Sequence, residues 1–153
     1  MMRAPAIFCA LLMLAAPANA QYVMKGAEDM TLLSGDALHD AFAGKTHYGT
    51  YKETRQESGT NTFTEIMDEN GRTLYREGKM KLEGYWDILV KDIMCFEYDN
   101  FPGRHCFRMY QSGTCIYGYN PIDTTALGPI NANAWAVKSI RKGDVSTCDD
   151  LIG

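Results

Sequence analysis

The sequence lacks the short motifs that mark several common enzyme classes. It contains no Gly-x-Ser-x-Gly nucleophile elbow and no glycine-rich loop that could cradle a phosphate. Its three histidines, His39, His47 and His105, show no HxH or HExxH spacing, which argues against a zinc site. No Cys-x-x-Cys pair is present, which argues against a thioredoxin-type redox centre. We therefore expect a protein that is not an enzyme and that uses no metal or cofactor.

The sequence also lacks an excess of positive charge and a long apolar run. Its formal net charge is −4, which argues against nucleic acid or an anionic membrane surface as the main partner. The apolar run from Ala4 to Ala16 is too short to span a bilayer, and no other segment is long or apolar enough. We expect no stable membrane insertion.

The start of the chain has the pattern of an export signal. Arg3 supplies the positive charge, the apolar run follows, and Ala18-Asn19-Ala20 is a small-x-small cleavage site. We predict cleavage after this tripeptide, which removes residues 1–20 as a signal peptide and leaves residues 21–153 as one domain. Cys9 lies inside the apolar run with no lipoprotein-like cleavage pattern after it. The sequence therefore predicts a soluble periplasmic or secreted protein.

Four cysteines remain after such cleavage: Cys95, Cys106, Cys115 and Cys148. An even number in an exported chain favours two disulfides, and four cysteines allow three pairings. We favour Cys95–Cys106 together with Cys115–Cys148, because the second bond would hold the C-terminal tail against the sheet.

The first of these pairings agrees with a strand register between residues 82 and 120. Placing Cys95 opposite Cys106 also places Glu97 opposite Arg104, an attractive cross-strand pair. Apolar partners then meet on the other face, Met94 with Phe107 and Phe96 with His105. Asn100–Gly103 supplies the turn between these two strands.

Three further connections set the neighbouring registers. A three-residue connection at residues 90–92 puts Trp86 beside Phe96. A two-residue turn at Ser112-Gly113 closes Gln111 on Thr114 and puts Met109 opposite Ile116. A turn at Asn70-Gly71 joins two more strands. Its predicted pairs are Met67 with Leu74 and Glu65 with Arg76.

The remaining elements complete a mainly β fold. Ser34–Gly44 predicts a short amphipathic helix, with Ser34 as N-cap and Gly44 past its end. Lys45–Lys52 predicts a strand in which Gly49 marks a bulge or a close approach. Ala134–Ile140 predicts the last strand. One helix and seven or eight short strands indicate an antiparallel barrel or sandwich, and we favour a meander barrel with the helix at one end.

Aromatic residues are concentrated between residues 82 and 120, and we take seven residues there as the candidate binding face. Tyrosine and arginine are enriched at binding hot spots, whereas cross-strand and cation–π packing on an ordinary sheet is the structural alternative. Four of them lie on the inner face of the strands predicted between residues 82 and 120: Trp86, Phe96, His105 and Phe107. The other three lie on the opposite face: Arg108, Tyr117 and Tyr119.

Three functions remain open from the sequence. The favoured one is a non-enzymatic periplasmic binding module for a protein, a glycan or a small apolar ligand. The second is an inhibitor of a cell-wall or proteolytic enzyme that docks the Asn100–Gly103 or Pro121–Asn133 loop. The third is a hydrolase whose catalytic residues form no motif that we recognise in the sequence. A cleft that gathers His105 with a carboxylate and an unpaired Cys115 would favour it. An unfilled barrel cavity would favour a carrier of small apolar ligands.

Several short motifs carry a resemblance. Leu33-Ser34-Gly35-Asp36-Ala37-Leu38, Gly84-Tyr85-Trp86 and the following Cys95 and Cys106 resemble a family of small exported alphaproteobacterial proteins known as a domain of unknown function. The resemblance covers roughly residues 31–119 and implies a periplasmic β-rich domain without a known activity. Gly84-Tyr85-Trp86 is also similar to the Gly-x-Trp motif of lipocalins, where it lies on the first strand; here it follows several predicted strands.

Overall fold

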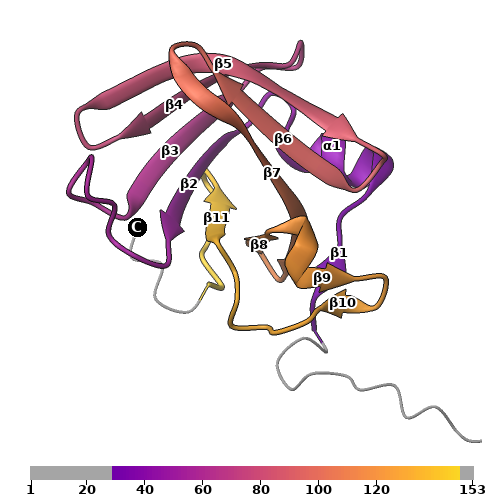
Figure 1. Ribbon diagram of the computed structural model, residues 1–153. Coiled ribbons are helices and arrows are strands. Elements are labelled where there is room, and N and C mark those ends of the chain that lie inside the picture. Colours follow the sequence, from indigo (N-terminus) through magenta and orange to yellow (C-terminus); the bar gives the residue numbers. More distant parts are fainter. Residues whose placement is uncertain (1–28, 149–153) are drawn as a thin grey trace, which may run out of the picture.

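The computed structural model describes residues 29–148 and consists mainly of antiparallel strands (Figure 1). The predicted signal peptide therefore lies outside the described residues. The elements, in chain order, are β1 (Thr31–Leu32), α1 (Gly35–Phe42), β2 (Thr46–Tyr51), β3 (Thr62–Met67), β4 (Arg72–Glu77), β5 (Met80–Leu89), β6 (Ile93–Tyr98), β7 (Phe101–Ser112), β8 (Cys115–Tyr119), the 3₁₀ turn η1 (Pro121–Asp123), β9 (Thr124–Thr125), β10 (Gly128–Pro129) and β11 (Val137–Arg141).

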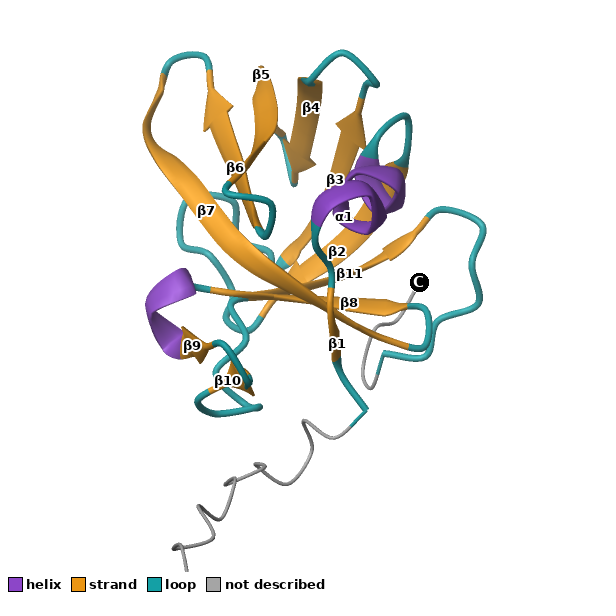
Figure 2. Cartoon of the chain, turned by 90° about the vertical axis from the view of Figure 1, so that its right-hand side faces the viewer, coloured by secondary structure: helices purple, strands orange, loops and turns teal. Residues whose placement is uncertain are grey.

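Eight of these strands close into a barrel. Strands β2 to β8 pair in chain order, β11 lies between β8 and β2, and every pairing is antiparallel. The long strand β7 crosses the molecule, pairing with β6 along its first part and with β1 and β8 near its end (Figure 2). Closure removes the exposed sheet edges on which chains aggregate. The predicted meander barrel with one helix is confirmed.

The predicted register around the first cysteine pair is present. Cys95 lies opposite Cys106 and is bonded to it, and Trp86 lies opposite Phe96. The connection between β5 and β6 has three residues, as expected, and its first two take positive φ angles of 43° and 71°. The cysteine pair, the charge pair and the apolar face all required this same register, which explains why it could be predicted from the sequence.

The turn between β6 and β7 is shorter than predicted. Tyr98 pairs with Phe101, so the turn consists of Asp99 and Asn100, with Asn100 at φ 62°. The register shifts between this pair and the next, Glu97 with Arg104, and Pro102 and Gly103 are left over inside β7. The proline and glycine that indicated a turn thus accommodate a bulge, a place where both residues are tolerated.

The predicted register of the β3–β4 hairpin is wrong by one residue. Asp68 donates its backbone N–H to the carbonyl of Arg72 at 2.8 Å, so the loop has three residues and ends on Gly71 at φ 83°. A three-residue loop with glycine in the left-handed region is the next most common hairpin after the two-residue turn. Glu65 therefore lies opposite Tyr75, not opposite Arg76. A one-residue shift reverses the faces of β4, so that Tyr75 points into the barrel.

The predicted register of the β7–β8 hairpin is also wrong, but by two residues. Ser112 pairs with Cys115 and Met109 lies opposite Gly118, not opposite Ile116. Gly113 takes φ 59° at the first loop position, which suits hairpin turns that require a positive φ there. A shift by two residues keeps every side chain on its predicted face.

Helix α1 closes one end of the barrel, where it packs beside β5 and β6 (Figure 1). Its two buried residues, Leu38 and Phe42, join an apolar cluster that includes Trp86, Met94 and Met109. The helix starts after Ser34, whose side chain makes no cap hydrogen bond. This end of the barrel is filled by side chains.

The C-terminal part of the described chain is held by the second disulfide. Cys115 of β8 is bonded to Cys148, and both are buried against Ile140. The last strand begins three residues later than predicted, so Trp135 precedes it. The ammonium groups of Lys52 and Lys138 lie 5.7 and 4.8 Å from the centre of the Trp135 ring, a cation–π arrangement on the outside of the barrel.

Candidate functional site

The barrel encloses a cavity of about 140 Å³. Phe42 of α1 lines one end of it, and the rest of its wall comes from the barrel strands and from Arg55 in the β2–β3 loop. Inward-facing residues such as Phe63 and Phe107 are only partly buried, because the space in front of them is not filled. The wall is mostly aromatic and aliphatic, with a few buried polar groups.

An aromatic belt surrounds the cavity away from α1. We use this name for six residues of β2, β3, β4, β6 and β7: Tyr51, Phe63, Tyr75, Tyr98, His105 and Phe101. Successive rings of the belt lie 5.0, 5.7, 5.4, 6.3 and 5.7 Å apart between centroids. These are the separations at which aromatic rings attract one another.

Glycines on the inner face make room for the belt. A Cβ atom on Gly49 of β2 would lie 2.1 Å from Cζ of Phe63, so the ring occupies the place of the missing side chain. Gly84 of β5 pairs with both Thr73 and Tyr98, and a Cβ atom there would lie 2.1 Å from the carbonyl oxygen of Glu97. This glycine belongs to the Gly-x-Trp segment, and its role here is to let β5 and β6 approach closely.

Glu65 of β3 is a buried carboxyl group in the cavity wall. Alternation along β3 places it inside, between Phe63 and Met67. It accepts hydrogen bonds from the hydroxyls of Thr73 and Tyr98, the second at 3.0 Å. Burial disfavours the charged form and raises the pKa of Glu65 to about 7, although both hydrogen bonds act in the opposite direction.

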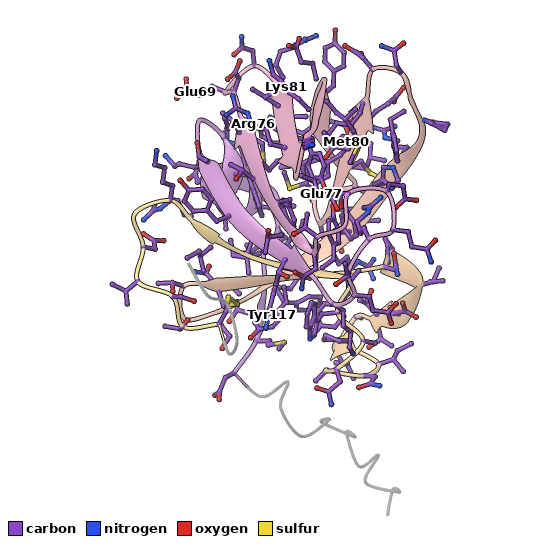
Figure 3. The ribbon with its side chains drawn as sticks, turned by 90° about the vertical axis from the view of Figure 1, so that its left-hand side faces the viewer. Glu69, Arg76, Glu77, Met80, Lys81 and Tyr117 are labelled. Atoms are coloured by element: carbon purple, nitrogen blue, oxygen red, sulfur yellow. A yellow bond between two sulfur atoms is a disulfide. The ribbon has the colours of Figure 1, made fainter. Side chains whose placement is uncertain are left out.

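Glu77 of β4 is a second buried carboxyl group, and it has a cationic partner. Nε of Arg55 lies 3.6 Å from its Oε1. The hydroxyl of Ser58 donates to the same oxygen at 2.5 Å, and the hydroxyl of Tyr75 donates to the other oxygen. The guanidinium of Arg55 also lies 4.9 Å from the centre of the Tyr51 ring. In Figure 3, Glu77 lies within the barrel, whereas Arg76 and Lys81 of the same hairpin are exposed on its outside.

His47 of β2 joins the cavity wall to the helix. Its Nε2 lies 3.0 Å from the carbonyl oxygen of Ala41 and its Nδ1 lies 3.3 Å from the hydroxyl of Ser139. Nε2–H therefore donates to the carbonyl, and Nδ1 accepts from the serine. The ring stacks on Phe42 at 4.6 Å, and burial lowers the pKa of His47 to about 4. His47 is a neutral structural residue.

His105 presents an unsatisfied nitrogen at the cavity. Its Nε2 is buried and has no hydrogen-bond partner among residues 29–148. The side chain lies on the inner face of β7, opposite Phe96. Burial, together with the positive charge of Arg55, lowers the pKa of His105, so the imidazole is neutral at neutral pH. Buried polar atoms of this kind usually have a partner, which makes His105 a functional candidate.

The seven candidate binding residues separate into two groups in the structure. Phe96, His105 and Phe107 line the cavity. Trp86 also faces inward, but it belongs to the apolar cluster under α1, and its indole N–H donates to the carbonyl of Asp68 at 3.0 Å. Three of the seven residues therefore line the cavity, whereas Trp86 is packed in the apolar cluster under α1 and does not line it.

The other three candidates lie on the outside of the barrel. Arg108 forms an ion pair with Asp92, with Nε 3.1 Å from the carboxylate. Tyr119 is fully buried under the β8–β11 connection, and Tyr117 packs against the second disulfide. Tyr117 is labelled in Figure 3. These three side chains form no common face with the cavity.

The β8–β11 connection exposes large apolar side chains. The exposed fractions of Ile122, Leu127 and Ile130 are 86%, 78% and 51%. The hydrogen bonds that hold the connection on the barrel include one from Arg108 to the hydroxyl of Thr124 at 2.9 Å and one from Tyr119 to the carbonyl of residue 132 at 2.7 Å. Arg108 and Tyr119 thus hold a projecting segment in place.

Sequence reasoning missed two polar residues of the cavity wall, Glu65 and Tyr75, and the buried Glu77 that accepts a hydrogen bond from Tyr75. The incorrect β3–β4 register assigned the wrong face to β4. A signal was present, because Thr73, Tyr75 and Glu77 alternate with Leu74 and Arg76, so one face of this strand is polar whichever register is chosen. Cys115 is in a disulfide, so the unpaired thiol that would have favoured a hydrolase is not present.

Within residues 29–148, no three or more His, Cys, Asp or Glu side chains are grouped so that they could hold a metal ion. The single helix of this part of the chain is too short to cross a membrane. Comparisons with protein-family models, with curated proteins and with solved structures found no match.

Proposed function

We propose that this protein is a non-enzymatic, exported binding module that holds one small, largely apolar ligand inside its barrel. The observation that carries the proposal is the cavity of about 140 Å³ behind the aromatic belt. Ligand sites are typically concave and apolar, with a few polar groups that fix orientation. Eight-stranded barrels are wide enough to hold one small ligand.

The size of the cavity limits the ligand. An apolar protein cavity of about 150 Å³ binds benzene or xenon. The ligand is therefore a single ring, or a short chain of similar volume, and a long fatty chain is too large. The aromatic belt favours a flat ring that can stack against it.

One feature of the structure and one of the sequence support export to the periplasm or the cell exterior. Both disulfides close within the described chain, and disulfides persist in oxidising compartments. The expected signal at residues 1–20 would deliver the chain there. Mass spectrometry of the protein after expression in a bacterium tests this: a mature chain starting at Gln21 with no free thiol is the expected result.

Titration of the purified protein with phenol, benzyl alcohol and benzylamine, followed by NMR, tests ligand binding. We expect saturable shifts of the methyl signals of Met67 and Met109, which line the cavity. Ala136→Phe places a ring at the small lining residue Ala136 and should abolish binding. Ala126→Phe, at an exposed site in the β9–β10 turn, is the matched control and should bind normally. Binding by none of the three compounds, or binding that survives Ala136→Phe, would contradict the proposal.

The projecting β8–β11 connection favours a second candidate function, recognition of a partner protein such as the enzyme of the inhibitor hypothesis. Its exposed apolar residues, Ile122, Leu127 and Ile130, sit on a segment that is already anchored, so little conformational entropy is lost on docking. A photo-crosslinking residue at position 127 should capture a specific partner that the same residue at exposed Asp40 does not. Identical adducts from both positions would contradict this function.

A further inference from the structure

Two carboxyl groups are buried here, Glu65 in the cavity wall and Glu77 in contact with Arg55 and Tyr75 of that wall, and they differ in one respect. Glu77 is matched by the guanidinium of Arg55. Glu65 accepts only from the neutral hydroxyls of Thr73 and Tyr98. Among residues 29–148, no cationic side chain forms an ion pair with Glu65. A buried carboxylate is strongly disfavoured unless a cation accompanies it. The described chain supplies Glu65 with hydrogen bonds but with no counter-charge.

The nearest candidate for that counter-charge is already engaged elsewhere. His47 is the cross-strand neighbour of Glu65. Both of its ring nitrogens are used, one by the carbonyl of Ala41 and the other by Ser139. Its lowered pKa of about 4 keeps it neutral at neutral pH. His47 therefore does not neutralise Glu65.

Two other features of the cavity suit a positively charged guest. The aromatic belt presents ring faces, and cations are attracted to the faces of aromatic rings, most strongly where water is excluded. The unsatisfied Nε2 of His105 can accept a hydrogen bond, and an ammonium group has three donors and no acceptor. Carboxylate, ring faces and imidazole thus complement the same chemical group.

We infer that the ligand of this cavity is a small organic amine of about the size of benzene, whose ammonium group binds the Glu65 carboxylate among the rings of the belt. This inference rests on the proposed ligand-binding function and names the class of ligand. An anion is disfavoured, because Glu65 would repel it and because Arg55 is already paired with Glu77. A neutral ring compound would fill the space but leave the charge of Glu65 unmatched.

Binding of an amine should release a proton at mildly acidic pH. Glu65 carries a proton below its pKa of about 7, and that proton leaves for solvent when the ammonium group arrives. The apparent affinity for an amine should therefore rise about tenfold between pH 6 and pH 8. The ionisable groups in the rest of the wall are His47, Tyr51, Arg55, Tyr75, Tyr98 and His105. Glu77 is not in the wall itself but contacts Arg55 and Tyr75.

These other groups do not obscure that pH dependence. Burial raises the pKa of Tyr51, Tyr75 and Tyr98, so they stay neutral donors. The pKa values of His47 and His105 are lowered. The lining residues from α1, β5, β8 and β11 are apolar residues, a glycine and a serine, and none of them titrates.

Three compounds of matched shape and different charge test the inference: benzylamine, benzyl alcohol and benzoate. At pH 8, benzylamine should bind at least tenfold more tightly than benzyl alcohol, because a hydrogen bond between charged groups is stronger than one to a neutral hydroxyl. Its affinity should fall about tenfold at pH 6, whereas that of benzyl alcohol should not change. Calorimetry or NMR titration on the full chain measures all three.

Substitution of Glu65 separates this inference from the function on which it depends. Glu65→Gln should reduce benzylamine affinity at least tenfold and leave benzyl alcohol within threefold. Glu97→Gln, an exposed position on β6, is the matched control and should change neither. Equal or tighter binding of benzyl alcohol or benzoate, or unchanged benzylamine binding in Glu65→Gln, would overturn the inference while ligand binding stands. Binding by none of the compounds would overturn both, and the wild-type comparison remains decisive if Glu65→Gln does not fold.

Discussion

At the scale of single residues, the cavity depends on glycines of the inner face as much as on the side chains that line it. Gly49 lies directly opposite Phe63 in the β2–β3 pair, and the ring lies over the glycine. Placing an aromatic ring over a strand glycine recovers packing that the glycine cannot provide. The position of this ring determines how much of the barrel stays open.

Gly49→Ala should therefore destabilise the protein and close part of the cavity. The added methyl would lie 2.1 Å from Cζ of Phe63, so the ring must move toward the cavity. We expect a loss of about 1–3 kcal/mol in the free energy of unfolding and weaker phenol binding. Urea unfolding measures the first effect. The double variant Gly49→Ala with Phe63→Leu should recover part of both, and a double variant worse than the single one would contradict this account.

At the scale of elements, the two disulfides constrain different parts of the fold. Cys95–Cys106 joins adjacent strands that already pair in the barrel, across 11 residues of sequence. Cys115–Cys148 spans 33 residues and ties the C-terminal segment to β8. The buried neighbours of the second bond are few, so the covalent link carries more of the attachment of this segment.

Removal of the longer disulfide should cost more stability than removal of the shorter one. The loop-closure relation predicts a loss of about 4 kcal/mol for Cys115→Ala with Cys148→Ala, and about 3 kcal/mol for Cys95→Ala with Cys106→Ala. Urea unfolding of both double variants under the same conditions measures the difference. A larger loss for the shorter loop would indicate that packing around β6 and β7 dominates over chain entropy.

The anchoring of the β8–β11 connection also belongs to this scale. Tyr119→Phe removes the hydrogen bond from its buried hydroxyl to the carbonyl of residue 132, and this partly buried acceptor loses its partner. We expect a loss of about 1–3 kcal/mol in stability and faster backbone amide exchange at Ala134 and Ile130. Tyr48→Phe, at a partly exposed tyrosine on the outside of β2, is the matched control. Unchanged exchange in Tyr119→Phe would mean that other contacts hold the connection.

At the scale of the whole molecule, two buried groups give the stability opposing pH dependences. The folded pKa of His47 is lowered from 6.5 to about 4, so the unfolded chain binds more protons in that range, and stability rises with pH from 4 to 6.5. The folded pKa of Glu65 is raised from 4.5 to about 7, so the folded chain binds more protons, and stability falls as pH rises from 4.5 to 7. Where the ranges overlap, the two effects offset one another.

Glu65→Gln should therefore remove one of the two opposing effects and leave the rise in stability with pH that His47 causes. Relative to wild type, the variant should gain about 3 kcal/mol in the free energy of unfolding between pH 4.5 and pH 7.5. Urea unfolding at four pH values measures this difference, and Glu97→Gln should show no such trend. A difference between variant and wild type that does not change with pH would mean that Glu65 is not buried in the folded state.

Prediction from the sequence succeeded where independent constraints coincided. The β5–β6–β7 register had to satisfy a cysteine pair, a charge pair and an apolar face together, and it is correct. At Asn70-Gly71 a glycine with positive φ suits both a two-residue and a three-residue loop, so the local sequence could not distinguish them. The predicted register paired Glu65 with Arg76 and so put Tyr75 on the opposite face from Glu65, whereas the two residues lie side by side in the cavity wall.

The sequence by itself determined the strand-rich class, the short helix after Ser34 and the Cys95–Cys106 pair, because these depend on alternation, turn chemistry and neighbouring strands. Tertiary structure alone decided that the sheet closes with β11 between β8 and β2, and that Glu65 lies buried with no counter-charge among residues 29–148. Closure brings together residues far apart in the chain, and the energy of a buried charge depends on everything that surrounds it. No local pattern in the sequence contains that information.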